Sequence, residues 1–143
     1  MLRIKKLDHV AVCVPDLDAA LARYEALLGV KGESREASAE LATEAVLLPI
    51  GEGNIELVAP HGEGGALARF LEKKGPGLHH VALEVEGLDA AIALLKALGV
   101  TLVDDTPRIG ARGHRVAFIH PRATGGLLVE LVEPAPGSRG ERA

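Results

Sequence analysis

The sequence predicts an α+β fold built from two tandem copies of one module, and three observations lead to this prediction. Residues His9–Leu27 align with His80–Leu98 at an offset of 71, and both segments contain His-Val-Ala and Leu-Asp-Ala-Ala. Residues Ile55–Pro60 align with Val129–Pro134 at an offset of 74. Within each copy the spacing of apolar residues changes from the period of a strand to that of a helix. Two diverged copies of a single module account for all three observations.

The first copy begins with a strand and continues with a helix. His9–Val14 alternates with period two, which is typical of a strand. Asp16–Leu28 then predicts a helix with one apolar stripe, formed by Leu17, Leu21, Tyr24 and Leu28. Asp16 or Asp18 is expected to cap the start of this helix, and Gly29 to end it.

Short β-prone runs separated by turn residues follow each helix. In the first copy these runs are Ala42–Ile50 and Ile55–Val58, joined by a turn over Gly51–Asn54. The second copy repeats the order, with a strand over His80–Val85 and a helix bounded by Gly87 or Asp89 and by Gly99. Its later β-prone runs are Leu102–Asp104, Arg115–His120 and Leu127–Val132.

We expect one domain of residues 1–143, with the first module over about 4–60 and the second over about 78–133. Gly62–Lys74 predicts a helix that connects the modules, so that the linker covers about 62–75, and Gly75-Pro76-Gly77 ends it. The last nine residues, 135–143, are expected to be a frayed tail.

Composition excludes several classes of function. The net charge is −4 and the basic residues are scattered among acidic ones, so no basic stripe favours nucleic acid. No apolar run approaches the length of about 20 residues that a membrane span needs. The N-terminus lacks a signal-peptide hydrophobic region, which favours a cytoplasmic protein. The single cysteine, Cys13, lies in a strand pattern and is expected to be buried, although a catalytic thiol is the alternative.

Each copy carries one histidine at an equivalent place. Alternation puts His9 on the same strand face as Ala11, opposite the aliphatic valines. The same rule puts His80 on the face of Ala82 and Glu84. The small alanines beside both histidines leave room for a ligand.

Each copy also carries one glutamate within an apolar strand, Glu56 in the first and Glu130 in the second. An ionised carboxylate is costly to bury without a partner such as a metal ion or an arginine. Two imidazoles and two carboxylates suit a borderline divalent ion such as Co²⁺, Mn²⁺, Ni²⁺ or Zn²⁺. The alternative is that both histidines simply begin strands and both glutamates face solvent.

Five segments carry a resemblance to a known family, in the order and spacing of that family. They are Leu7–Val12 (LDHVAV), Gly77–Ala82 (GLHHVA), Ile109–Gly113 (IGARG), Phe118–Pro121 (FIHP) and Gly126–Leu131 (GLLVEL). They resemble the vicinal oxygen chelate superfamily and, within it, the methylmalonyl-CoA epimerase family. The resemblance covers residues 4–133. It implies paired βαβββ modules that form an incomplete eight-stranded barrel around a metal ion.

The resemblance also implies a ligand set and a reaction. His9, His80 and Glu130 are implied as metal ligands, with Glu56 at a fourth position, and Co²⁺ is the expected ion. The implied reaction interconverts (2R)- and (2S)-methylmalonyl-CoA by moving the C2 proton, with Glu130 and Glu40 as the two bases. Glu44, four residues beyond Glu40, is the rival for the second base. A homodimer is expected, as is common in the superfamily.

His79, next to His80, is expected to flank the site rather than bind metal. The alternation of side chains along the strand and the alignment of the two copies both place His80, not His79, on the face of the site. His114 and His120 are interpreted as packing or surface residues, and His61 as an exposed turn residue.

Three other functions share this type of site or fold. A glyoxalase I acting on a glutathione hemithioacetal would use the same two histidines and two glutamates. An extradiol dioxygenase would use two histidines and one carboxylate around iron. A small-molecule-binding protein of the same fold would commonly use aromatic walls, whereas this chain has no Trp, two Phe and one Tyr.

Overall fold

The computed structural model describes residues 1–137, and it separates into two compact units. The first unit is His9–His79. The second unit combines Met1–Asp8 with the chain from His80 onward. The predicted tail lies partly outside the described residues, because positions 138–143 are not among them. No helix within residues 1–137 is long and apolar enough to cross a membrane.

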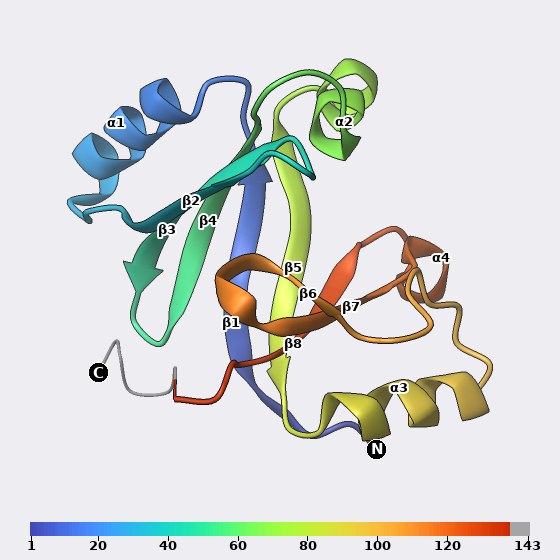
Figure 1. Ribbon diagram of the computed structural model, residues 1–143. Helices are drawn as coiled ribbons and strands as arrows, with labels where there is room; N and C mark the ends of the chain where they lie inside the picture. The colour runs from blue at the N-terminus through green and yellow to red at the C-terminus, as the bar shows by residue number, and fades with distance from the viewer. Residues whose placement is uncertain (138–143) are drawn as a thin grey trace. The chain divides into compact units, whose positions relative to one another are not determined.

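The first unit contains a mixed sheet in the strand order β2-β3-β4-β1 (Figure 1). The strand pair β1–β4 is parallel, whereas β2–β3 and β3–β4 are antiparallel. The elements are β1 (Ile4–Cys13, which enters this unit at His9), α1 (Leu17–Leu28), β2 (Glu33–Ser38), β3 (Thr43–Ile50), β4 (Gly53–Pro60) and α2 (Ala66–Lys74).

Helix α1 is capped at both ends by residues that the sequence predicts, Asp16 and Gly29. The Asp16 side chain accepts a hydrogen bond from the Ala19 N–H at 3.1 Å, which satisfies one of the donors left open at a helix start. Gly29 ends the helix in the left-handed conformation, with φ of 68°. The buried face of α1 presents Leu17 to Leu48 and Leu57 of the sheet, forming the core of this unit.

The second unit repeats this plan, with the strand order β5-β8-β7-β6. The pair β5–β8 is parallel, and β8–β7 and β7–β6 are antiparallel. The elements are β5 (Gly77–Val85, which enters this unit at His80), α3 (Leu88–Ala97), β6 (Arg108–Ile109), a 3-10 turn (Ala111–Gly113), β7 (Arg115–Ile119), α4 (Pro121–Thr124) and β8 (Val129–Glu133).

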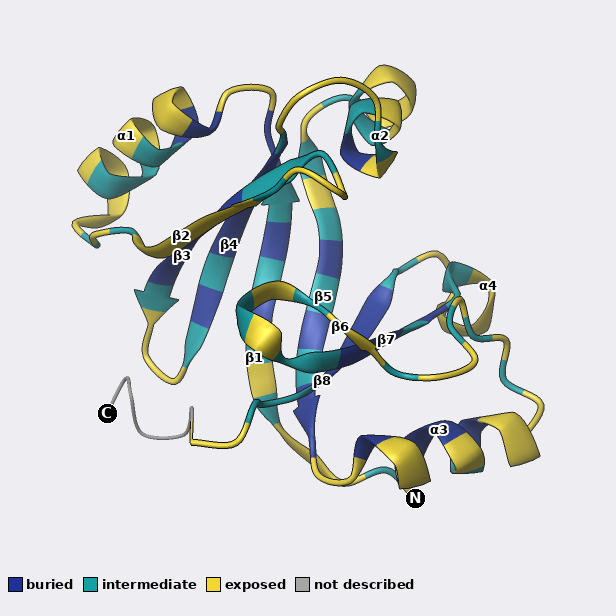
Figure 2. Ribbon diagram, viewed as in Figure 1, coloured by how far each residue is buried: buried dark blue, intermediate teal, exposed yellow. Residues whose placement is uncertain are grey.

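Helix α3 begins after Gly87 and lacks a capping side chain of its own. The carboxylate of Glu133, at the end of β8, accepts the Leu88 N–H at 3.0 Å and supplies the missing cap. Leu88 and Ile92 pack with Leu131 in the core of this unit. In Figure 2 the inner strands β4 and β8 are mostly buried, whereas the outward faces of α1 and α3 are exposed.

The predicted fold class is confirmed: the chain is α+β, with a βαβββ order in each of two copies, and the second copy adds the short helix α4 between β7 and β8. The strand registers also follow the repeat, since Ala11 pairs with Glu56 in the first copy and Ala82 with Glu130 in the second. Equivalent residues therefore occupy equivalent places in the two copies.

Three elements differ from the patterns in the sequence. Strand β2 was not apparent as a β-prone run, because it is an edge strand with five exposed residues and no apolar alternation. Helix α2 begins at Ala66 rather than Gly62, since three glycines in the preceding four residues adopt positive φ. The Leu102–Asp104 run makes only an isolated bridge, from Leu102 to Ile119, and the second unit's edge strand is β6.

Candidate functional site

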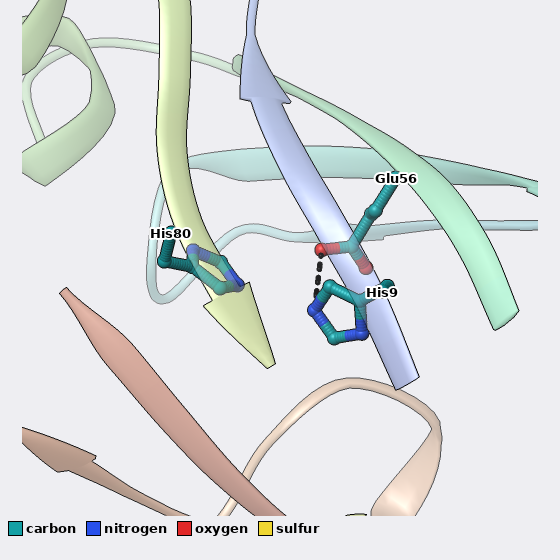
Figure 3. A group of neighbouring side chains, drawn as sticks. All are labelled: His9, Glu56 and His80. Atoms are coloured by element: carbon teal, nitrogen blue, oxygen red, sulfur yellow. Dashed lines mark ion pairs between the residues drawn. The ribbon is translucent and has the colours of Figure 1, made fainter. Parts of the chain in front are cut away.

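The first unit brings together the two polar residues that the repeat singled out in it. His9 on β1 and Glu56 on β4 lie on neighbouring parallel strands, with Ala11 directly opposite Glu56. The His9 Nε2 atom is 3.4 Å from the Glu56 Oε1 atom, and the dashed line in Figure 3 marks this contact. His9 and Glu56 are only 6% and 5% exposed, so the alternative that this glutamate faces solvent is wrong. His9 also lies within β1 rather than at its start.

The second unit contains the same arrangement. His80 on β5 and Glu130 on β8 lie on neighbouring parallel strands, with Ala82 directly opposite Glu130. The His80 Nε2 atom is 3.2 Å from the Glu130 Oε1 atom. These residues are 7% and 9% exposed. A buried histidine–glutamate pair is therefore a repeated feature of the fold.

Both pairs have the chemistry of a divalent metal site. Adjacent ligand atoms that each lie about 2.1 Å from an octahedral ion are about 3.0 Å apart. The nitrogen–oxygen separations of 3.4 Å and 3.2 Å are close to that spacing. His9, Glu56 and His80 are each buried, and Figure 3 labels these three side chains. The donor set of imidazole and carboxylate fits Co²⁺, Mn²⁺, Ni²⁺ or Zn²⁺.

Comparison with known families agrees with the fold and the donor set. The family model described as the glyoxalase/bleomycin resistance protein/dioxygenase superfamily matches residues 8–118, most of the chain. The chain belongs to this superfamily. The resemblance predicted from the sequence motifs is thereby confirmed at the level of the superfamily.

Members of the superfamily that are similar to this chain include methylmalonyl-CoA epimerases. The human mitochondrial enzyme is 38% identical over 127 residues, which cover 88% of this chain and 72% of the human one. An ethylmalonyl-CoA/methylmalonyl-CoA epimerase of Cereibacter sphaeroides is 40% identical over 130 residues, covering 90% of this chain and 97% of that one.

Solved structures of methylmalonyl-CoA epimerases are also similar to this chain, in both sequence and fold. The methylmalonyl-CoA epimerase of Mycobacterium tuberculosis is 41% identical, with a TM-score of 0.87, and the match covers 93% of this chain and 90% of that one. A methylmalonyl-CoA epimerase solved in complex with methylmalonyl-CoA and NH₄⁺ is 32% identical, also with a TM-score of 0.87, over 93% of this chain and 96% of that one. The chain is thus an enzyme related to methylmalonyl-CoA epimerases.

The two candidates for a second base differ in their surroundings. Glu40 is exposed in the turn Ala39–Ala42 between β2 and β3. Glu44 lies on β3, where its carboxylate accepts a hydrogen bond from Arg35 at 2.9 Å. The Nδ1 atom of His61 is 3.4 Å from the other Glu44 oxygen. Glu44 therefore belongs to a surface charge cluster.

The remaining histidines have contacts that suit a packing role. The His79 ring packs against Phe70, with centroids 4.8 Å apart. His114 Nδ1 accepts the Ala135 N–H at 2.8 Å, and His120 Nδ1 accepts the Arg122 N–H at 3.0 Å at the start of α4. His61 has a side chain that is half exposed.

Cys13 is fully buried, as its strand pattern predicts. Burial raises the pKa of the Cys13 thiol to about 11, because the thiolate would lose its hydration. The protonated thiol is a poor nucleophile at neutral pH, which argues against the alternative of a catalytic thiol.

Sequence reasoning missed two arginines, each of which forms ion pairs with one helix and one strand. Arg35 binds Asp18 of α1 at 2.6 Å and Glu44 at 2.9 Å. Arg115 binds Asp89 of α3 at 2.9 Å and Glu133 at 2.6 Å. The one sequence signal for these ion pairs was that Asp18 and Asp89 occupy equivalent positions in the two copies, at the offset of 71. The two arginines come from strands that do not correspond in the repeat, so alignment alone could not pair them.

Proposed function

We propose that this chain interconverts (2R)- and (2S)-methylmalonyl-CoA by exchanging the proton at C2. The observation that carries the proposal is the buried histidine–glutamate pair at the same register in both modules. The similarity to methylmalonyl-CoA epimerases over most of the chain supports the choice of substrate. The epimerase of Cereibacter sphaeroides, which is named for both substrates, makes ethylmalonyl-CoA a second candidate.

We infer that both pairs share one divalent ion, with His9, Glu56, His80 and Glu130 as its ligands. Co²⁺ is the first choice, and Mn²⁺, Ni²⁺ and Zn²⁺ are compatible with the same donors. These four residues would hold the ion and would leave room for substrate oxygens to bind it. When bound, the ion would supply positive charge that stabilises the negative charge developing on the thioester oxygen.

Epimerisation requires a base on each face of the planar carbon, so that one group removes the proton and the other returns it. We assign Glu130 to one face and Glu40 to the other. Glu130 lies in the buried pair with His80. The carboxylate of Glu44 is already bound by Arg35, which favours Glu40 as the second base.

The matched variants Glu40→Ala and Glu44→Ala test the second base. We expect Glu40→Ala to bind metal like the unaltered protein and to lose epimerisation, because only one face of the carbon would keep a base. Glu44→Ala should keep most of its activity. Full activity in Glu40→Ala would remove this residue from the mechanism.

The reaction is tested by supplying stereochemically pure methylmalonyl-CoA to chelator-treated protein, with and without added Co²⁺, and following loss of the starting epimer by chiral separation. Ethylmalonyl-CoA and the methylglyoxal–glutathione hemithioacetal serve as competing substrates. We expect Co²⁺-dependent turnover of the CoA esters. Turnover of the hemithioacetal alone would instead identify a glyoxalase, and turnover of none would indicate a binding protein.

The cytoplasmic location and the homodimer stay predictions. The human, mouse and bovine relatives are mitochondrial enzymes, so membership of this family does not by itself indicate the cytoplasm. Sedimentation of the purified chain measures its oligomeric state.

A further inference from the structure

An aromatic side chain lies beside the histidine–glutamate pair of the second unit. Phe118 on β7 is the direct cross-strand partner of Glu130 on β8. Glu130 is in turn opposite Ala82 on β5. Directly paired residues on neighbouring strands project to the same face of a sheet. Since His80 shares the face of Ala82, the Phe118 ring belongs to the face that carries the pair.

The Phe118 ring contacts the His80 imidazole directly. The ring centroids are 5.5 Å apart and the ring planes meet at 89°, an edge-to-face arrangement. This geometry is one of the two preferred for aromatic pairs, whose centroids usually lie about 4.5–7 Å apart. A ring packed in this way restricts rotation of the imidazole about its bond to Cβ, which sets the direction of the Nε2 atom.

Two charged residues hold Phe118 in its place. The Asp104 carboxylate accepts the Phe118 N–H at 3.1 Å. The guanidinium carbon of Arg108 lies 5.7 Å from the centre of the Phe118 ring, within the range of a cation–π contact. The Arg108 Nε atom is also 3.5 Å from Asp104. Asp104 therefore links the backbone of Phe118 to the cation above its ring.

The first module has no ring at the corresponding position. Leu47 corresponds to Phe118 at the offset of 71, and it pairs with Glu56 as Phe118 pairs with Glu130. The aromatic contact is thus a departure from the repeat, made in the second module.

We propose that Phe118 is a positioning residue for His80, and that Asp104 and Arg108 hold its ring against the imidazole. The inference rests on the proposed function in one respect, namely that His80 is a metal ligand. Phe118 acts through His80: the ring reduces the number of imidazole orientations that must be lost when Nε2 binds the ion. Residues that orient a ligand in this way commonly affect metal affinity.

The chain offers a matched control, because its two phenylalanines pack against the two members of the tandem histidine pair. Phe118 contacts His80, and Phe70 contacts His79. We compare Phe118→Leu, which introduces the residue of the first module, with Phe70→Leu. Phe118→Tyr keeps the ring and tests for rescue.

Calorimetric titration of the metal-free protein with Co²⁺, without substrate, measures the effect. We expect Phe118→Leu to bind Co²⁺ about 3- to 10-fold more weakly, the range that corresponds to the loss of one favourable aromatic contact. Phe70→Leu and Phe118→Tyr should stay within about twofold of the unaltered protein. The visible absorption of bound Co²⁺ should change in Phe118→Leu alone, since a merely structural role would leave the ligand field unaltered.

Nuclear magnetic resonance of the metal-free protein tests the contact itself. We expect the His80 ring protons to shift in Phe118→Leu and to stay in place in Phe70→Leu. Unchanged His80 signals, or Co²⁺ affinity equal to that of the unaltered protein in Phe118→Leu, would overturn this inference alone. Failure of the unaltered protein to bind Co²⁺ would overturn the metal site of the proposed function, so the two failures are distinguishable.

Discussion

Replacing His80 should remove most of the stabilisation that a bound ion confers, whereas replacing its neighbour His79 should not. His80 is buried with its Nε2 atom 3.2 Å from Glu130, and His79 packs against Phe70 instead. A four-ligand protein site binds its ion with roughly 12 kcal/mol, so one ligand contributes about 3 kcal/mol. His80→Ala should therefore weaken Co²⁺ binding by about 150-fold.

The assay is thermal unfolding at a Co²⁺ concentration of about 100 times the Kd of the unaltered protein, where binding stabilises the fold by about 2.7 kcal/mol. At about 3 °C per kcal/mol for a chain of this size, the ion should raise Tm by about 8 °C. In His80→Ala the stabilisation falls to about 0.3 kcal/mol, or about 1 °C. His79→Ala should keep the full increase. An equal loss in both variants, or a full increase in His80→Ala, would refute the assignment of His80.

Three further predictions concern stability and reactivity. Leu131→Ala should lower the free energy of unfolding by about 2–5 kcal/mol in urea titrations, because it leaves a cavity in the core, whereas Leu27→Ala on the surface should change it by less than about 0.5 kcal/mol. The buried Cys13 thiol, with its pKa raised to about 11, should not react with a disulfide reagent at pH about 8 until denaturant is added; rapid reaction in the folded state would contradict its burial. The hydrogen bond from Arg115 lowers the pKa of Asp89 below its ordinary value of 3.8. The ion pair therefore stabilises the fold at pH values above 3.8, and this stabilisation is lost as the pH falls through the lowered pKa of Asp89. Asp89→Asn should reduce this acid dependence in urea titrations, and an unchanged dependence would show that the ion pair is too well hydrated to contribute.

The internal repeat carried most of what could be predicted from the sequence. It located β1 and β5 and the two helices that follow them, because each combines a clear hydrophobic period with end signals such as Asp16 and Gly29. It also predicted that Glu56 and Glu130 occupy equivalent positions, which the two strand registers confirm.

The elements that sequence reasoning missed have little hydrophobic pattern. Strand β2 is an exposed edge, and β6 has only two residues, so neither shows the alternation by which a half-buried strand is recognised. Their pairing with neighbouring strands, rather than their own composition, keeps them extended.

Contacts between side chains distant in sequence were also beyond prediction. The sequence shows Phe118 as an apolar strand residue and as the start of the FIHP segment, but its contact with His80 depends on the pairing of three strands. The partners of Arg115 come from α3 and from the end of β8, which no local pattern brings together. The role of Glu40 as a base stays a prediction.

Hydrogen–deuterium exchange at C2 of methylmalonyl-CoA, measured in D₂O by mass spectrometry on chelator-treated protein before and after addition of Co²⁺, tests the central claim most directly. Our account predicts rapid incorporation of deuterium with the ion, slow incorporation without it, and loss of the ion-dependent rate in His80→Ala. Exchange that proceeds equally well after removal of divalent ions, or that is absent when Co²⁺ is bound, would contradict it.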